Sequence, residues 1–267
     1  MKTFNISTTA AFVIAGAGIS TAKHGNRSVT SKSGSADVLE HLGVNLNMQT
    51  ENVKRAIEKI GIGFLFAPAF HPAMKFAVGP RKEVGIRTVF NILGPLTNPA
   101  NANAQLLGVY DPKLTASMAE ALFRLGCQEA MVVHGENGLD EISTIGKTNI
   151  SYLKDDKIKT LQIFPKDLNL RKTSVEKLAG GTPEENAHTT LKILHGDCSK
   201  TDPKLEIVLA NAAAGIVVGG KAETLKQGIE IARESIRNRA AYNKLKELVK
   251  FSEGNLSTIT EFEDKSD

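Results

Sequence analysis

The densest group of side chains able to bind an anion lies between Lys23 and Asp37. This segment, KHGNRSVTSKSGSAD, carries three lysine or arginine residues, one histidine and five hydroxyl groups. Its two glycines allow close approach of the backbone, and charge-assisted hydrogen bonds from such a loop can enclose a multiply charged phosphate ester. A solvated basic loop is the alternative. Because His24 has no second histidine at ligand spacing, the segment does not predict a metal site built on it.

A second polar segment, Thr3-Phe4-Asn5-Ile6-Ser7-Thr8, stands directly before an alanine-rich apolar run. The free N–H groups and the dipole at the start of a helix favour a phosphate group. An ordinary N-cap role for Ser7 and Thr8 is the alternative, because a hydroxyl oxygen there accepts a bond from the first free amides. We therefore expect a helix to begin near residue 8.

Two adjacent carboxylates, Asp140 and Glu141, follow an apolar run that ends at His134. Mg²⁺ commonly takes one or two protein carboxylates and completes its coordination with substrate phosphates and water. Since an Asp-Glu pair is also common on protein surfaces, the prediction of a magnesium site depends on the basic loop upstream.

The segment from Gly79 to Pro99 contains Arg81 and Arg87 among several glycines and prolines. An arginine side chain can bind a carboxylate through two parallel hydrogen bonds, which a lysine cannot do. One of the two arginines could instead pair with Glu83 as a structural salt bridge. The glycines and prolines are expected to shape turns.

These segments must be positioned by strands and helices, which the hydrophobic pattern predicts. The expected strands are 19–23, 105–110 and 130–134 with an antiparallel pair at 149–153 and 157–164, and the expected helices are 36–42, one from residue 183 and a long one through 225–248. This alternation predicts an α/β fold with a mixed, largely parallel sheet flanked by helices. Each polar segment then lies at a strand end or a helix start, where such proteins bind ligands. The polar tail after Phe251 is expected to fray.

The composition restricts the class of protein. A length of 267 residues with 41% hydrophobic content fits one large domain, alone or with a small companion. A net charge of +4 is too small to predict nucleic-acid binding by itself. Cys127 and Cys198 lack a CxxC spacing, which speaks against a disulfide framework and favours a reducing cytoplasm. The apolar run at 10–18 is too short to span a membrane and predicts a buried helix.

Several long motifs resemble the anthranilate phosphoribosyltransferase family. They are FNIST, KHGNRSVTSKSGSADVLEHLG, FLFAPAFHPAMK followed by GPRKEVGIRTVFNILGPLTNPA, VVHGENGLDEIS, GGTPEENA and NAAAGIVVGGKAETLKQGIEIA. Long motifs in a fixed order are far more specific than a short fingerprint. The resemblance covers essentially the whole chain and implies a nucleoside phosphorylase/phosphoribosyltransferase-like fold. It implies an α/β domain over 1–74 and 101–267, with a remnant of the small helical domain over 75–100.

The resemblance implies a transfer reaction of tryptophan biosynthesis. The amine of anthranilate attacks the anomeric carbon of phosphoribosyl pyrophosphate (PRPP), pyrophosphate leaves, and N-(5-phosphoribosyl)anthranilate forms, with Mg²⁺ as the metal. An aromatic amine of low basicity needs an activated leaving group more than it needs a general base. Catalysis is therefore expected to depend on positioning and on neutralising the pyrophosphate, with no catalytic side chain.

The resemblance also assigns residues, position by position. Asn26 and Arg81 match anthranilate-binding positions, with Arg81 expected to hold the carboxylate. Ser7, Asp140 and Glu141 match the Mg²⁺ positions. The positions matched to PRPP are Thr3, Asn5, Ile6, Ser7, Thr8, Lys23, His24, Gly25, Asn26, Arg27, Ser28, Val29, Thr30, Ser31 and Ser35.

In this family a bundle of helices and a GTGGDG-type loop precede the FNIST segment, whereas this sequence starts at that segment. The resemblance therefore implies a chain shortened at its N-terminus. Such a chain lacks a loop whose N–H groups bind pyrophosphate, a strand of the sheet, and the helices that form the family's homodimer, so activity of the chain alone is not expected to be full. We expect Met1 to be an internal methionine rather than the start of a genuinely shortened copy, because the matched polar residues are intact.

Two other functions are alternatives. A catalytically silent relative could bind nucleic acid or another anion in the basic groove, although Asn26, Arg81, Asp140 and Glu141 count against it. A pyrimidine nucleoside phosphorylase has a related fold but a different basic loop. We therefore expect small-molecule partners, anthranilate and PRPP, and neither nucleic acid nor a membrane.

Overall fold

The strands of the molecule form two separate sheets. The computed structural model describes residues 3–28, 32–74, 76 and 90–266. Within that part of the chain the strands are β1 (Thr21–Gly25), β2 (Ile62–Phe66), β3 (Ala104–Gly108), β4 (Glu129–Gly135), β5 (Thr148–Lys154) and β6 (Lys157–Ile163). β1 and β2 form a parallel pair, and the other four strands form a sheet in the order β3-β4-β5-β6. In the four-stranded sheet β3 and β4 are parallel, whereas β4 and β5, and β5 and β6, are antiparallel. The predicted α/β fold with a mixed sheet is therefore confirmed.

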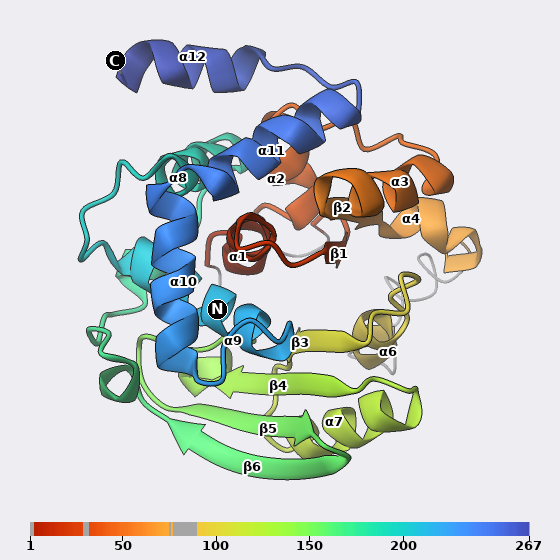
Figure 1. The fold of residues 1–267 in the computed structure, drawn as a ribbon, viewed down its shortest axis with the longest axis vertical. Coiled ribbons are helices and arrows are strands. Elements are labelled where there is room, and N and C mark those ends of the chain that lie inside the picture. Colours follow the sequence, from red (N-terminus) through yellow and green to blue (C-terminus); the bar gives the residue numbers. More distant parts are fainter. Residues whose placement is uncertain (1–2, 29–31, 75, 77–89, 267) are drawn as a thin grey trace.

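Helices surround and separate the two sheets (Figure 1). They are α1 (Ile6–Gly16), α2 (Ser35–His41), α3 (Thr50–Ile60), α4 (Ala67–Phe70), α6 (Phe90–Leu96), α7 (Leu114–Arg124), α8 (Pro183–His195), α9 (Pro203–Val218), α10 (Leu225–Arg237), α11 (Ala240–Phe251) and α12 (Ser257–Ser266). Short 3₁₀ turns lie at Pro72–Met74, Glu136–Gly138, Pro165–Leu168 and Glu176–Leu178. None of the helices in the described part of the chain has the length and hydrophobicity to cross a membrane.

Helix α9 forms the centre of the core. Its sequence, PKLEIVLANAAAGIVV, is apolar on nearly every side, and all residues from Leu205 to Val218 are buried. A helix without a polar face must be covered all round. It contacts β3 and β4 of the larger sheet and also α1, which in turn contacts β1 and β2, so α9 and α1 together lie between the two sheets.

Helix α1 begins earlier than the sequence predicted. Asn5 occupies the N-cap position, and its carbonyl oxygen accepts bonds from the amide and the hydroxyl of Thr9, each at 3.0 Å. Ser7 and Thr8 lie inside the first turn, so the N-cap alternative for these two residues is wrong. The buried helix predicted over the apolar run is confirmed.

The long helix predicted through 225–248 is broken into α10 and α11. The apolar spacing continues across the break, but Arg239 adopts a left-handed conformation with φ of 63°. The side chain of Asn238 accepts a bond from the amide of Ala240 at 2.9 Å and so starts a new helix. Because neither glycine nor proline marks this site, the hydrophobic pattern alone could not reveal it.

The C-terminal tail is folded, contrary to the prediction that it frays. Helix α12 places Ile259 and Phe262 in the core, with exposed fractions of 1% and 8%. Glu263 accepts bonds from the Tyr242 hydroxyl at 3.2 Å and from the Lys246 ammonium at 2.8 Å. Two apolar residues one turn apart in an otherwise acidic segment are enough to dock the helix.

The hairpin of β5 and β6 is confirmed at its predicted turn. Asp155 and Asp156 have φ of 50° and 56°, as a two-residue turn of the type that fits twisted strands requires. The first strand begins two residues later than predicted, at Thr21 rather than at residue 19. The amide of Thr21 donates to the carbonyl oxygen of Gly61, directly before β2.

Candidate active site

A cavity of about 1430 Å³ lies between the two sheets. The amide of Thr21 in β1 bonds toward β2, and that of Val109 beyond β3 bonds toward β4. The N–H and C=O groups of successive residues in a strand point to opposite edges of the strand. The main-chain groups of Ala22 and His24 therefore point away from β2, and those of Gly108 point away from β4. All three residues line the cavity, which is therefore bounded by an edge of each sheet that pairs with no other strand among the described residues.

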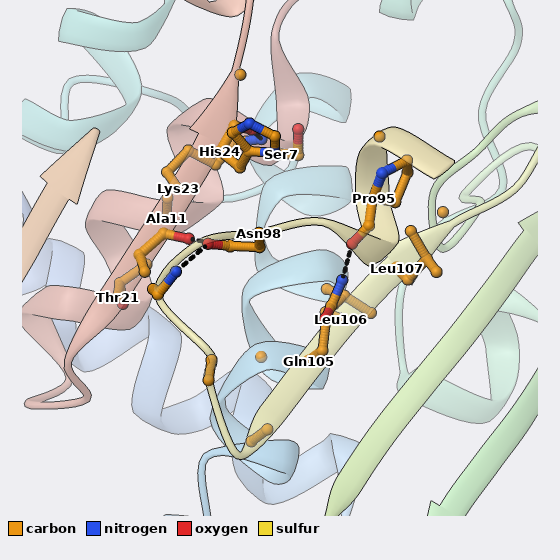
Figure 2. A pocket seen from close by; sticks show the side chains of 18 of the residues that line it. Ser7, Ala11, Thr21, Lys23, His24, Pro95, Asn98, Gln105, Leu106 and Leu107 are labelled. Carbon is orange, nitrogen blue, oxygen red and sulfur yellow. Dashed lines mark hydrogen bonds between the residues drawn. The ribbon is translucent and has the colours of Figure 1, made fainter. Parts of the chain in front are cut away.

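Side chains already occupy two of these edge carbonyl groups. Asn98 donates from Nδ2 to the carbonyl oxygen of Ala22 at 3.1 Å (Figure 2). Lys23 donates from Nζ to the carbonyl oxygen of His24 at 3.2 Å. The amide and ammonium groups thus satisfy main-chain acceptors that a strand would otherwise use.

Many of the residues predicted for the site meet in this cavity. Those that line it are Ser7, Lys23, His24, Gly25, Asn26, Asp140 and Glu141. They come from the start of α1, the end of β1 and the turn after β4, which are far apart in the sequence. The cavity thus brings Lys23 together with two carboxylates, a set of charges that agrees with a site for a polyanion and a cation.

The carboxylate pair has the electrostatics of a cation site. Burial and the neighbouring Asp140 raise the pKa of Glu141 to about 8, although Lys23 and a main-chain bond from Ser7 act against this rise. Burial in turn lowers the pKa of Lys23, an effect that Glu141 and Asp140 oppose. A divalent cation would remove the repulsion between the two carboxylates. No group of three metal-ligating side chains exists among the described residues, so Mg²⁺ would need oxygen atoms from a substrate.

A pair of histidines, His24 and His71, forms another wall of the cavity. The rings of His24 and His71 pack edge to face with centroids 5.2 Å apart. Burial, His71 and Lys23 lower the pKa of His24 to about 4. The Nε2 atoms of both rings are buried and have no hydrogen-bond partner among the described residues.

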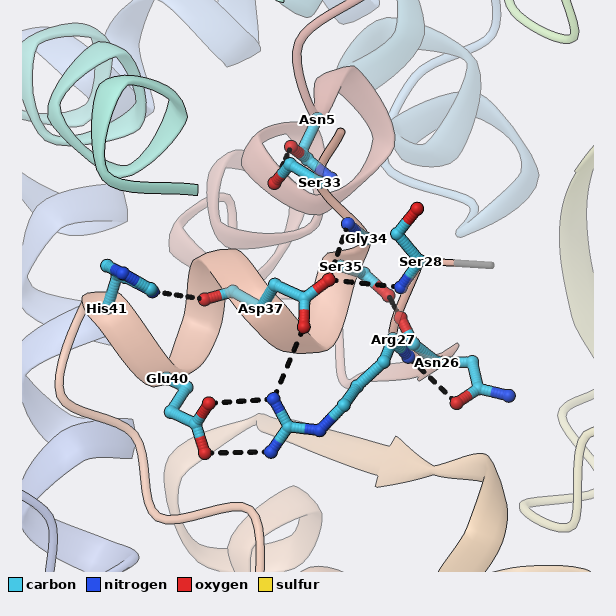
Figure 3. Close-up of polar contacts among 10 residues, drawn as sticks. All are labelled: Asn5, Asn26, Arg27, Ser28, Ser33, Gly34, Ser35, Asp37, Glu40 and His41. Carbon is cyan, nitrogen blue, oxygen red and sulfur yellow. Dashed lines mark hydrogen bonds and ion pairs between the residues drawn. The ribbon is translucent and has the colours of Figure 1, made fainter. Parts of the chain in front are cut away.

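The basic loop is closed by one aspartate (Figure 3). Asp37 accepts bonds from the amides of Ser28 at 3.0 Å and Gly34 at 2.8 Å. Arg27 forms two bonds with Glu40, at 2.7 and 2.8 Å, and one with Asp37 at 3.2 Å. Its guanidinium group is therefore turned toward α2, and neither Arg27 nor Ser28 nor Ser35 lines the cavity.

The start of α1 meets the loop at a second polar cluster. The side-chain oxygen of Asn5 accepts bonds from the Ser33 hydroxyl at 3.4 Å and from Nδ2 of Asn186 at 3.1 Å. The side chains of Ile6 and Thr8 are buried, with exposed fractions of 1% and 2%, so these residues can offer a ligand main-chain groups only. Thr3 and Asn5 do not line the large cavity but lie at the same end of α1.

Four of the predicted site residues lie outside the described residues: Val29, Thr30, Ser31 and Arg81. Arg87 and Glu83, the alternatives for the salt bridge, lie outside them as well. Conversely, the sequence prediction missed His71, Asn98 and Asn211, all of which line the cavity. A polar Asn211 inside the otherwise apolar helix NAAAGIVV was the one signal that could have been used.

The chain is similar to known enzymes over nearly its whole length. Residues 1–242 match the family described as "Glycosyl transferase family, a/b domain". The anthranilate phosphoribosyltransferase of Desulfatibacillum aliphaticivorans is 56% identical over 254 residues, which are 95% of this chain and 74% of that enzyme. Among solved structures, the Thermus thermophilus enzyme of the same name superposes with a TM-score of 0.89 at 44% identity, covering 95% of this chain and 74% of its own.

Structures of the Saccharomyces cerevisiae anthranilate phosphoribosyltransferase with bound ligands are also similar to this chain. The structure of that enzyme in complex with PRPP and Mg has a TM-score of 0.87 at 33% identity and covers 95% of this chain and 70% of its own. Its complex with 4-fluoroanthranilate has a TM-score of 0.86 at 32% identity, with the same coverage. The match to the family, the identities above 30% and the shared cavity-forming fold agree, and the chain belongs to the anthranilate phosphoribosyltransferases of the glycosyl transferase family.

Proposed function

We propose that the protein catalyses the transfer of the phosphoribosyl group from PRPP to the amine of anthranilate, and that this reaction takes place in the cavity between β1 and β3. The products are N-(5-phosphoribosyl)anthranilate and pyrophosphate, in tryptophan biosynthesis. The observation that carries the proposal is the meeting of Lys23 with Asp140 and Glu141 at the start of α1. We propose that this site binds three ligands together: a cation, a pyrophosphate group and an aromatic acid.

The pyrophosphate of PRPP is proposed to lie between Lys23 and the start of α1. Free N–H groups and the helix dipole favour a phosphate at this end of the helix. Asn5 and the loop that Asp37 closes stand at the same end, so Thr3, Asn5, Ile6, Ser7, Thr8, Gly25, Asn26, Ser28 and Ser35 complete the proposed set. Arg27 takes part only if it leaves Glu40, because its guanidinium group is already paired there.

Asp140, Glu141 and Ser7 are proposed to hold Mg²⁺. The raised pKa of Glu141, which burial and Asp140 cause, indicates a site short of positive charge. Bound to these residues and to PRPP, the metal neutralises charge on the leaving pyrophosphate. Lys23 adds a second positive charge nearby, and the protein itself supplies the orientation of the two substrates.

Anthranilate is proposed to lie against the histidine pair, with Asn26 and Arg81 as its polar contacts. The lowered pKa of His24 means that this ring is neutral at neutral pH, so it adds no positive charge to this wall of the cavity. The amine of anthranilate needs no strong base, since its proton is lost readily once the new bond has formed.

The remaining assignments follow the family. Residues 1–74 and 101–267 are assigned to the α/β domain and 75–100 to a remnant of the small helical domain. Both cysteines are free thiols, which agrees with a place in the cytoplasm.

The proposal is tested with the double substitution Asp140→Asn with Glu141→Gln. The rate of phosphoribosylanthranilate formation is monitored as the decrease in anthranilate fluorescence. This rate should fall by more than about 100-fold, because the loss of metal ligands has a larger effect than the loss of the groups that orient them. The control is Glu136→Gln, an exposed residue of the same turn that bonds only the amide of Lys147 in the described structure. Undiminished Mg²⁺-dependent turnover in the double variant would exclude the two carboxylates from the reaction.

A further inference from the structure

Asn211 is a polar residue in α9, a helix that is buried from Leu205 to Val218. It is completely buried in α9, as are its neighbours Ala210, Ala212 and Ala213. Burial of an amide side chain costs free energy unless its polar atoms are hydrogen-bonded. An apolar residue at this position would fit the surrounding core more simply, so the contacts of this side chain need a reason.

The polar atoms of Asn211 bond mainly to one residue outside the helix. Oδ1 accepts a bond from the amide of Ile142 at 2.8 Å, and Nδ2 donates to the carbonyl oxygen of Ile142 at 3.0 Å. A third bond runs from Nδ2 to the carbonyl oxygen of Ile207 at 2.9 Å and holds the side chain against its own helix. The two bonds hold the main chain of Ile142 on both sides: one bond is to the peptide group that joins Glu141 to Ile142, and the other is to the peptide group that joins Ile142 to Ser143.

The opposite side of the carboxylate turn is fixed by β3. A Cβ atom placed on Gly108 would lie 1.7 Å from the carbonyl oxygen of Asp140, so the two main chains are in direct contact. The turn that carries Asp140 and Glu141 is thus held between the strand and α9. The main chain of this turn cannot shift without disturbing one of these contacts.

Helix α9 also sets the distance from the carboxylates to α1. Gly215 lies four residues after Asn211, hence on the same face of the helix, and a Cβ atom there would lie 2.2 Å from the side chain of Ile14. Ser7, at the start of α1, gives its main-chain bond to Glu141. One face of α9 therefore carries both parts of the proposed metal site.

We infer that Asn211 is a positioning residue, which holds Asp140 and Glu141 in the arrangement that binds Mg²⁺ together with PRPP. This inference rests on the proposed function. The alternative is that Asn211 only joins α9 to the turn and contributes stability without affecting the metal. The two differ in what happens to metal affinity when the side chain is replaced in a protein that still folds.

The test compares Mn²⁺ binding in the presence of PRPP between the unaltered chain and Asn211→Leu, whose side chain branches at the same carbon but carries methyl groups in place of the amide oxygen and nitrogen. Free Mn²⁺ is measured by electron paramagnetic resonance and folding by circular dichroism. Loss of a group that orients metal ligands is expected to weaken Mn²⁺ binding by about 10- to 100-fold. If Asn211→Leu does not fold, Asn211→Ser serves instead, because its hydroxyl is too short to bridge both atoms of Ile142.

The matched control is Ser235→Ala. Ser235 is also a buried polar residue of a helix, 2% exposed, and its hydroxyl donates to the carbonyl oxygen of Val13 at 2.9 Å. This variant should lose stability and keep its Mn²⁺ affinity. Equal Mn²⁺ affinity in the folded Asn211 variant and the unaltered chain would overturn the inference alone. Absence of PRPP-dependent Mn²⁺ binding in the unaltered chain would overturn the proposed function and the inference with it.

Discussion

Asn98 and Ala22 are joined across the cavity by a hydrogen bond of 3.1 Å from the side-chain amide to the main-chain carbonyl. Asn98 lies in the segment between α6 and β3, and Ala22 lies on the open edge of β1. The bond therefore ties the chain that follows α6 to the sheet on the other side of the site.

Asn98→Ala is expected to lower the free energy of unfolding by about 1–3 kcal/mol, because it removes both this bond and the bond from the Ala100 amide to Oδ1, and one intramolecular hydrogen bond usually contributes about 0.5–1.5 kcal/mol. Asn98→Asp should lower it further, because a carboxylate faces the Ala22 carbonyl oxygen without a proton to donate. Urea unfolding of the two variants measures the difference. Equal stability of Asn98→Asp and the unaltered chain would show that the bond contributes nothing.

The buried ring of His24 makes stability depend on pH. Burial, His71 and Lys23 lower its pKa from 6.5 to about 4, so between these values the unfolded chain binds a proton that the folded chain does not. This contribution to stability is therefore complete above pH 6.5 and is lost as the pH falls toward 4. His24→Asn should flatten the rise of the melting temperature over this range. The control is His41→Asn on the exposed surface of α2; an equal change in both variants would refute the assignment to His24.

Gly108→Ala is expected to push β3 away from the carboxylate turn. The added Cβ atom would lie 1.7 Å from the carbonyl oxygen of Asp140, and main-chain atoms cannot yield as a flexible side chain does. Overpacking of this kind costs about 1–3 kcal/mol and should also weaken Mn²⁺ binding in the presence of PRPP. Gly94→Ala is the control, since nothing lies within 4 Å of its added Cβ atom, and helix propensity should make it stabilising by about 0.5–1 kcal/mol.

Phe262→Ala is expected to release α12 from the core. Replacement of a buried phenylalanine by alanine costs about 3–5 kcal/mol, which is more than a short terminal helix gains by docking. Limited proteolysis should therefore cut within 257–266 while the rest of the chain resists. Exposed Asp264→Ala on the same helix is the comparison, and equal protease resistance in both variants would contradict this account.

The local elements could be predicted where composition marks their ends. The β5–β6 hairpin, the helix starting at Pro183 and the strand that ends near His134 lie where the periodicity placed them. The break at Arg239 could not be predicted, because its left-handed conformation is held by the contacts of two packed helices rather than by a glycine. The folded tail was missed because the docking of Ile259 and Phe262 depends on a surface formed by distant segments.

The candidate site was predictable in its charged residues and not in their supports. Lys23, Asp140 and Glu141 stand out as charged residues at strand ends, and the structure brings them together. Asn98 and His71 gave no signal, since their roles arise only when the two sheets face each other across the cavity. The ion pairing of Arg27 was hidden for a related reason: its partners, Asp37 and Glu40, could be recognised only after α2 had been placed beside the loop.

The outermost strand of the larger sheet, β6, has features that oppose pairing with a strand of a second copy of this chain. The open edges of β1 and β3 face inward, whereas β6 has a free edge toward solvent within the described part of the chain. It carries Lys157 and Lys159, both exposed. Lysines on an edge strand oppose pairing with a second strand, so concentrated solutions of the protein should resist aggregation through this edge.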